Sequence, residues 1–140
     1  MPIEWITRES RTRSWHRINV NGQEIRVAGF RPGQGKGLWV CLTITPAVMA
    51  RMRWGAGELV SVGYDGTDNL YLKDDPGGFR LTPVGSARKD IRESRGKPVL
   101  SQIRFAWREG MSTKIEDGYS KVSDQITVEH QTGILTLGVV

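Results

Sequence analysis

The sequence predicts a small, mainly β protein: an antiparallel sheet or barrel of hairpins with one short helix near residues 46–54. Apolar and polar residues alternate at a period of two over residues 59–64 and 99–107, which is the pattern of half-buried strands. Turn sequences rich in glycine, asparagine and aspartate separate these runs. Residues 38–73 supply a strand, a short helix, a strand, a turn and a strand in succession, and the rest of the chain is expected to pack around them.

A hairpin and a connecting loop are predicted ahead of this central stretch. Alternating apolar residues on both sides of Asn21-Gly22 predict a hairpin at residues 15–28, because both central residues of a type I′ turn need positive φ. The glycine-rich residues 31–37 lack the Gly-Lys-Ser/Thr ending and the following helix of a phosphate-binding loop. We therefore interpret them as a connector.

The short helix has sequence signals at both ends. Thr45 is the expected N-cap, and Pro46 is tolerated at the first helical position because its missing N–H would have no partner there. Gly55 and Gly57 are expected to end the helix, since glycine adopts the left-handed backbone conformation without a Cβ penalty.

Further strands are expected on both sides of a polar segment. Residues 79–84 are predicted to form a short strand that Pro83 confines to a sheet edge, because proline cannot donate to the ladder. Residues 85–97 are the most polar stretch and fit either a short exposed helix or an ordered loop. A final hairpin is predicted at residues 126–137. It is similar to the central hairpin at residues 62–72, which indicates either a pseudo-repeat or two unrelated hairpins of a common kind.

The chain of 140 residues is expected to form one β-rich domain over residues 15–140, preceded by a mobile basic arm at residues 1–14. Residues 60–72 and 103–137 are expected to share one sheet. The one cysteine, Cys41, cannot form an internal disulfide, and its apolar surroundings predict a buried reduced thiol. The sequence has no signal-peptide pattern and no apolar run near the roughly 20 residues of a membrane-spanning helix. We therefore expect a cytoplasmic protein without membrane association.

No catalytic or metal-binding constellation is visible in the sequence, so we interpret the chain as a non-enzyme without a cofactor or metal. The two histidines, His16 and His130, have no cysteine or second histidine at ligand spacing. The adjacent carboxylates at 74–75 and 116–117 lie beside proline or glycine in turns, where acidic residues form local hydrogen bonds. Burial would raise the pKa of the Cys41 thiol, which disfavours a nucleophilic role.

Positive charge is clustered along the chain. The formal net charge is +5; residues 1–40 hold seven lysines or arginines against three acids, and residues 73–97 hold seven against four. Such clusters neutralise nucleic-acid phosphates and release counterions. The five tryptophans either stack on unpaired bases or fill the core, and the core is expected for Trp39, Trp54 and Trp107. The candidate residues for binding DNA or RNA are Arg8, Arg11, Arg13, Lys36, Arg88, Lys89, Arg92, Arg95 and Lys97.

Residues 38–73, about a quarter of the chain, carry an order of elements found in a known family. The residues in question are Ile44-Thr45-Pro46 at the strand-to-helix step, Met52 and Trp54 at the apolar end of the helix, and residues 57–62 at the turn and next strand. This segment resembles the swapped-hairpin DNA-binding family of the AbrB, MazE and SpoVT type. Lys36-Gly37 is similar to the basic residue and glycine that precede the first strand in that family. The resemblance implies a regulator of swapped-hairpin type with DNA contact at that point.

Two functions from different classes stay open. The first is a small nucleic-acid-binding protein that contacts phosphates, which predicts retention on DNA that weakens steeply with salt. The second is a structural or protein-interaction component, an accessory or assembly protein whose open sheet edges bind a partner chain or a second copy. That function predicts stable oligomers and no salt-dependent binding to DNA.

Overall fold

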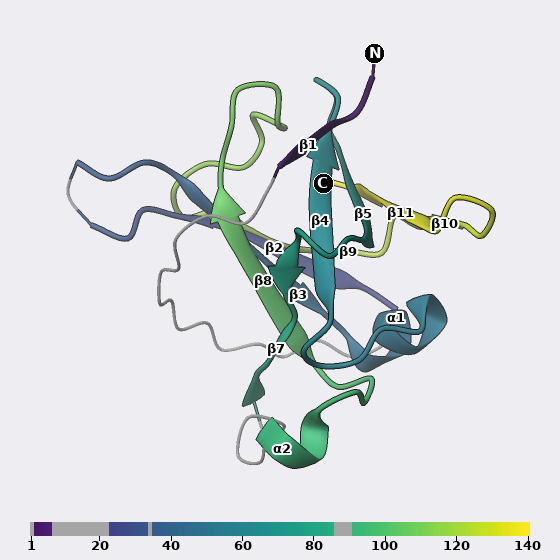
Figure 1. Ribbon diagram of the computed structural model, residues 1–140. Helices are drawn as coiled ribbons and strands as arrows, with labels where there is room; N and C mark the ends of the chain where they lie inside the picture. The colour runs from purple at the N-terminus through teal and green to yellow at the C-terminus, as the bar shows by residue number, and fades with distance from the viewer. Residues whose placement is uncertain (1, 7–22, 34, 86–90) are drawn as a thin grey trace.

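The computed structural model describes residues 2–6, 23–33, 35–85 and 91–140, which form two sheets packed face to face (Figure 1). Every strand pair within the two sheets is antiparallel. One hydrophobic cluster, with side chains from both sheets, lies between them. The mainly β class predicted from the sequence is confirmed.

The first sheet has the strand order β1-β4-β5-β11-β10, and β6 also pairs with β4. Its strands are β1 (Glu4–Ile6), β4 (Leu59–Tyr64), β5 (Asn69–Asp74), β6 (Phe79–Arg80), β10 (Ile126–Glu129) and β11 (Ile134–Gly138). The central hairpin β4–β5 and the final hairpin β10–β11 are confirmed, and β5 pairs with β11 to join them. Within the predicted N-terminal arm, β1 is paired with β4, and residues 7–14 lie outside the described residues.

The second sheet has the strand order β7-β8-β3-β2-β9. Its strands are β2 (Ile25–Phe30), β3 (Trp39–Ile44), β7 (Thr82–Pro83), β8 (Ser101–Ala106) and β9 (Ser120–Ser123). The strand predicted around residues 99–107 is therefore present as β8. It does not lie in the same sheet as β4 and β5. The prediction of one shared sheet is correct for β10 and β11, which lie in the first sheet, and wrong for residues 101–106 and 120–123, which lie in the second. Alternation shows which face of a strand is buried and does not show which strand lies beside it.

The second arm of the hairpin predicted at residues 15–28 is a strand, β2, but its predicted pairing is wrong. Both edges of β2 are occupied over residues 25–28, by β3 on one side and by β9 on the other. Residues 15–22 lie outside the described residues. The alternation around Ile25 and Val27 correctly predicts a strand, but the local Asn-Gly signal does not report that distant strands occupy its edges.

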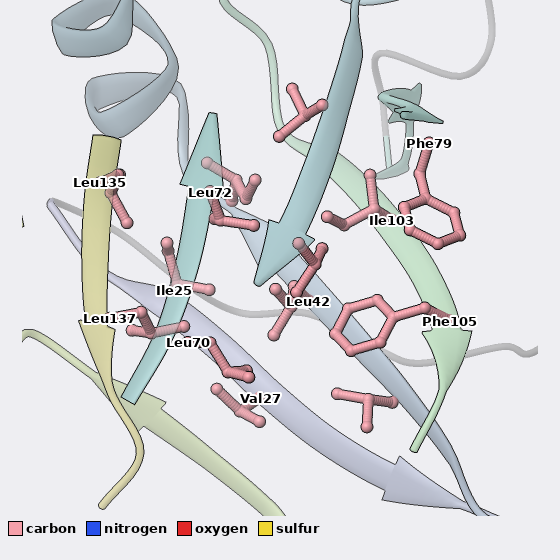
Figure 2. Packing of buried hydrophobic residues seen from close by; sticks show 14 of the residues in the cluster. Ile25, Val27, Leu42, Leu70, Leu72, Phe79, Ile103, Phe105, Leu135 and Leu137 are labelled. Atoms are coloured by element: carbon pink, nitrogen blue, oxygen red, sulfur yellow. The ribbon is translucent and has the colours of Figure 1, made fainter. Parts of the chain in front are cut away.

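Alternating side chains from both sheets fill the core (Figure 2). Nine of them are at most 2% exposed: Leu70, Leu72, Leu135 and Leu137 from the first sheet and Ile25, Val27, Leu42, Ile103 and Phe105 from the second. The rings of Phe79 and Phe105 have centroids 5.8 Å apart and connect the two layers. Burial of each such side chain contributes about 1.5–3 kcal/mol, so this interface between the sheets is the main source of stability.

The strand predicted at residues 79–84 divides at Leu81. Its first part, β6, pairs with β4 in the first sheet, and its second part, β7, pairs with β8 in the second. Leu81 is fully buried at the crossing. The edge position predicted from Pro83 is confirmed, since β7 is the outer strand of its sheet.

The predicted helix is confirmed as α1 (Pro46–Met52), but both of its ends differ from expectation. The Thr45 side chain does not cap the helix; its hydroxyl donates to the Glu24 carbonyl at 3.0 Å and ties the helix to the start of β2. The left-handed residue at the C-terminal end is Arg53, with φ 58°, and not Gly55. A second short helix, α2 (Ile91–Ser94), lies in the polar segment. No helix in the described parts of the chain is both long and apolar enough to cross a membrane.

Candidate nucleic-acid interface

A short segment, residues 53–58, connects α1 to β4 and lies against the chain that follows α2. The Ala56 N–H donates to the Lys97 carbonyl at 3.0 Å, and the Ala56 carbonyl accepts from the Gly96 N–H at 2.9 Å. The two segments approach each other most closely at glycines: a Cβ on Gly55 would lie 2.4 Å from the carbonyl carbon and oxygen of Gly96. This contact requires glycine at position 55, and it ties the segment after α1 to the segment after α2; in Figure 1, α1 lies at the lower right and α2 at the bottom.

The same connecting segment is hydrogen-bonded to the crossing between β6 and β7. The Gly57 N–H donates to the Leu81 carbonyl at 2.8 Å, and the Leu81 N–H donates to the Glu58 carbonyl at 2.8 Å. Arg80 Nη1 donates to the Gly57 carbonyl at 3.4 Å. Three parts of the chain that are far apart in sequence therefore meet here: the C-terminal end of α1, the β6–β7 crossing, and α2 with the turn that follows it.

These three parts carry a cluster of cations that we call the basic end. All of its members are exposed, and they are Arg51, Arg53, Arg80, Arg92, Arg95 and Lys97. The same stretches of chain carry two acids, Glu58 and Glu93, both exposed. The basic end therefore has an excess of positive charge on a surface that the backbone hydrogen bonds hold in place.

Among the described residues, these cations have few side-chain partners. None of the six forms an ion pair with a carboxylate in the described part of the chain, where Lys114–Asp68 is a salt bridge at 3.4 Å. Arg51 Nη1 donates to Gln23 Oε1 at 3.4 Å, and the Arg80 contact to a carbonyl is equally long. Neither partner is charged, so the positive potential of the cluster is not neutralised by them.

The structure brings together only some of the residues predicted to bind nucleic acid. Arg92, Arg95 and Lys97 lie in the basic end. Lys36 does not, because it lies in the loop that joins β2 to β3, whereas α1 starts at the other end of β3. At about 3.3 Å per residue, the length of β3 separates the two places by roughly 20 Å. Five predicted residues lie outside the described residues: Arg8, Arg11, Arg13, Arg88 and Lys89.

Sequence reasoning missed three members of the basic end, namely Arg51, Arg53 and Arg80. The prediction was based on the density of positive charge along the sequence. That density is high in residues 1–40 and 73–97, whereas the segment around α1 contains only two arginines. A signal was present for Arg51 and Arg53, since both fall outside the apolar face of the predicted helix. Nothing local marks Arg80, whose position depends on the crossing of the chain from one sheet to the other.

The described tryptophans offer little stacking surface for bases. Trp54 is 2% exposed and belongs to the core, as predicted, and its Nε1 has no hydrogen-bond partner among the described residues. Trp39 and Trp107 are half-buried. The Trp5 ring packs on Gly63, where an added Cβ would lie 3.0 Å from it, and Lys73 Nζ lies 4.1 Å from the ring centroid. This cation–π contact anchors β1 to its sheet.

Other candidate chemistry is weak. Cys41 is 1% exposed, and burial raises the pKa of its thiol, outweighing the opposite effect of Arg104 and Thr43. The described residues contain no cluster of three or more metal-binding side chains. His130 is exposed in the turn after β10. Asp75 accepts from the Gly77 N–H at 2.8 Å, which is the local turn bond expected from the sequence.

Comparison with known proteins adds no assignment. No protein-family model, no curated protein and no solved structure matches this chain. The resemblance of residues 38–73 to the AbrB type therefore stays a prediction. What the basic end can do has to be argued from its own geometry: it presents several guanidinium groups and one ammonium group on a rigid support, an arrangement suited to phosphate oxygens.

Proposed function

We propose that this protein is a small, non-enzymatic nucleic-acid-binding protein and that its basic end contacts backbone phosphates. One observation carries the proposal: six exposed cations from three distant parts of the chain gather around residues 53–58, and none is paired with a described carboxylate. Arginine forks match phosphate oxygens and are more weakly hydrated than ammonium groups, so five arginines favour such a ligand. The net charge of +5 assists the approach of a polyanion.

DNA is the form of nucleic acid that we favour. The resemblance of residues 38–73 to the swapped-hairpin family implies contact with DNA and a regulatory role, and α1 within this segment contributes Arg51 to the basic end. Phosphate contacts alone carry no sequence information, so the proposed binding is largely independent of sequence. If all six cations neutralise phosphates of duplex DNA, the logarithm of the affinity should fall with the logarithm of salt with a slope of about −5.

A fluorescence anisotropy titration tests this proposal. The purified chain is titrated into a short labelled duplex of arbitrary sequence, and separately into a single strand, between about 50 and 200 mM salt. Binding that weakens steeply over this range supports the proposal. Absence of binding at the lowest salt, or binding that ignores salt, refutes it.

A matched pair of double variants locates the contact. Arg95→Gln/Lys97→Gln removes two charges from the basic end, and Lys114→Gln/Lys121→Gln removes two charges from exposed lysines elsewhere. The first should lower affinity by about tenfold or more and reduce the salt slope by about two. The second should change affinity by less than about threefold, because only long-range attraction is altered. Equal losses in both variants would mean that net charge, and not this surface, governs binding.

A second candidate function, pairing with another protein chain, rests on the edge strand β10. Most outer strands of the two sheets carry features that discourage pairing: β1, β6 and β7 have at most three residues, β7 contains Pro83 and β9 carries Lys121. By contrast, β10 has four residues, Ile-Thr-Val-Glu, with no proline, glycine or lysine. Its inward side chains, Ile126 and Val128, are only half-buried although they pack against the core.

A second copy of this chain is the occupant that fits this edge best. Antiparallel pairing centred on Thr127 would place Ile126 opposite Val128 of the second copy and would keep both apolar residues on the core face. Thr127→Lys would then set two like charges directly opposite each other. Sedimentation analysis over a range of concentrations should show a dimer that this substitution abolishes. A monomer at all concentrations would exclude the pairing.

A further inference from the structure

The C-terminal end of α1 has an unusual backbone. Arg53 adopts φ 58° and ψ 34°, in the left-handed region. It is the one non-glycine residue with positive φ in the described parts of the chain, where eight glycines have positive φ. The left-handed conformation is unfavourable for residues with a Cβ, and glycine or asparagine is usual at this position of a helix.

The surrounding fold imposes this conformation. The Arg53 N–H donates to the Ala50 carbonyl at 3.1 Å, and the Trp54 N–H donates to the Met49 carbonyl at 2.8 Å. Trp54 is almost fully buried, so the chain must turn sharply to place it in the core directly after the helix. The turn would form with glycine at position 53 as well, and with less strain.

No interaction of the Arg53 side chain with the described residues offsets the free-energy cost of this conformation. The side chain is exposed, and it has no ion pair or side-chain hydrogen bond with another described residue. Residues that the surrounding fold holds in sparsely populated backbone conformations cluster at functional sites. Here the strained residue is an arginine at the start of residues 53–58, the segment around which the basic end is assembled.

We infer that Arg53 is the anchoring residue of the basic end: its guanidinium binds a phosphate group of the ligand, and the chain keeps arginine there at the expense of stability. This inference rests on the proposed function. The left-handed turn fixes the direction of the Cα–Cβ bond, whereas Arg51 extends from the regular surface of the helix. The planar guanidinium of Arg53 matches a phosphate with two parallel hydrogen bonds, which a lysine ammonium group does not provide.

Arg53→Gly separates binding from stability, because the two should change in opposite directions. Relief of backbone strain should raise the melting temperature by several degrees. Loss of the guanidinium should weaken binding to a short DNA duplex at low salt by about tenfold. Arg51→Gln is the matched control on the same helix: it removes one charge without changing backbone strain, so it should weaken binding less and leave the melting temperature nearly unchanged.

Two further substitutions identify the cause. Arg53→Asn tolerates the left-handed conformation and should behave like Arg53→Gly. Arg53→Lys keeps the charge and the strain but loses the paired hydrogen bonds, so its affinity should lie between those of the wild type and the glycine variant. If affinity follows charge alone, Arg53→Lys will bind as the wild type does, and the role of the guanidinium is overturned.

The outcomes distinguish this inference from the function on which it rests. If the wild type does not bind DNA at low salt, the proposed function fails and Arg53 has no such role. If the wild type binds and Arg53→Gly binds equally well, the proposed function stands and the anchoring role of Arg53 is overturned. Weaker binding by the glycine variant without a rise in melting temperature would overturn the claim that stability is given up at this position.

Discussion

Gly55→Ala should destabilise the protein by forcing apart two segments that support the basic end, residues 53–58 and the turn after α2. The added Cβ would lie 2.4 Å from the carbonyl carbon and oxygen of Gly96, whereas ordinary contacts begin near 3.4 Å. The two segments must therefore separate by about 1 Å, since the carbonyl carbon and oxygen of Gly96 belong to the backbone and cannot rotate away. That movement would stretch the two hydrogen bonds of Ala56, now 3.0 and 2.9 Å, beyond useful length.

Two lost hydrogen bonds cost about 2 kcal/mol together, and residual overpacking adds to this. Alanine in place of glycine lowers the conformational entropy of the unfolded chain, which stabilises the folded state by about 0.5 kcal/mol. We expect a net loss of about 1.5–3 kcal/mol, which for a chain of this size lowers the melting temperature by roughly 5–10 °C. Urea unfolding followed by tryptophan fluorescence measures the free energy of unfolding directly.

Gly37→Ala is the matched control for this substitution. No atom lies within 4 Å of a Cβ built on Gly37, and its φ is not in the left-handed region. This variant should be as stable as the wild type or slightly more so. If Gly55→Ala unfolds at the same urea concentration as Gly37→Ala, the close approach of residues 55 and 96 is refuted, and with it the rigid support proposed for the basic end.

Two further predictions concern titratable groups. Burial alone would raise the pKa of Asp65, but hydrogen bonds from Thr67 and Tyr71 lower it below its ordinary value. Its contribution to stability is therefore present above the pKa of the unfolded state and is lost as pH falls through the lower pKa of the folded state. Asp65→Asn should lower the urea midpoint at neutral pH more than at acid pH, and an equal effect at both pH values would contradict the lowered pKa. Cys41 should react with a thiol reagent only when the protein unfolds, because the thiol is buried and its pKa is raised by that burial; rapid reaction under native conditions would contradict its placement.

The sequence predicted most strands well because alternation is a local property. The hairpins β4–β5 and β10–β11 depend on turns of five residues or fewer and on neighbouring runs, and both are present. The strand β2 was predicted from the same kind of pattern, but its pairing was wrong. Its two partners, β3 and β9, are selected by the packing of the whole core, and no feature within residues 15–28 encodes that choice.

The crossing at Leu81 also shows that a local sequence pattern does not predict which strands pair. Residues 79–84 have the composition of one short strand, yet Leu81 is buried where the chain passes from the first sheet to the second. A sequence pattern shows that Leu81 is apolar, and it cannot show that the residues on either side belong to different layers. The position of Arg80 beside the end of α1 follows from this crossing, which is why the charge pattern alone did not place it in the candidate site.

The Arg53 position shows how a failed prediction can indicate function. Glycine at 55 was expected to end α1, because the rules for helix ends assume that each residue serves the stability of its own element. In the structure Gly55 is needed for contact with Gly96, and the left-handed position two residues earlier is taken by Arg53, whose side chain forms no ion pair or hydrogen bond with another described residue. A local rule is broken here, and such breaks are expected at functional or strained sites. The rule is broken within the basic end, whose six cations form no ion pair with a carboxylate among the described residues, and this coincidence makes Arg53 the most informative residue to change.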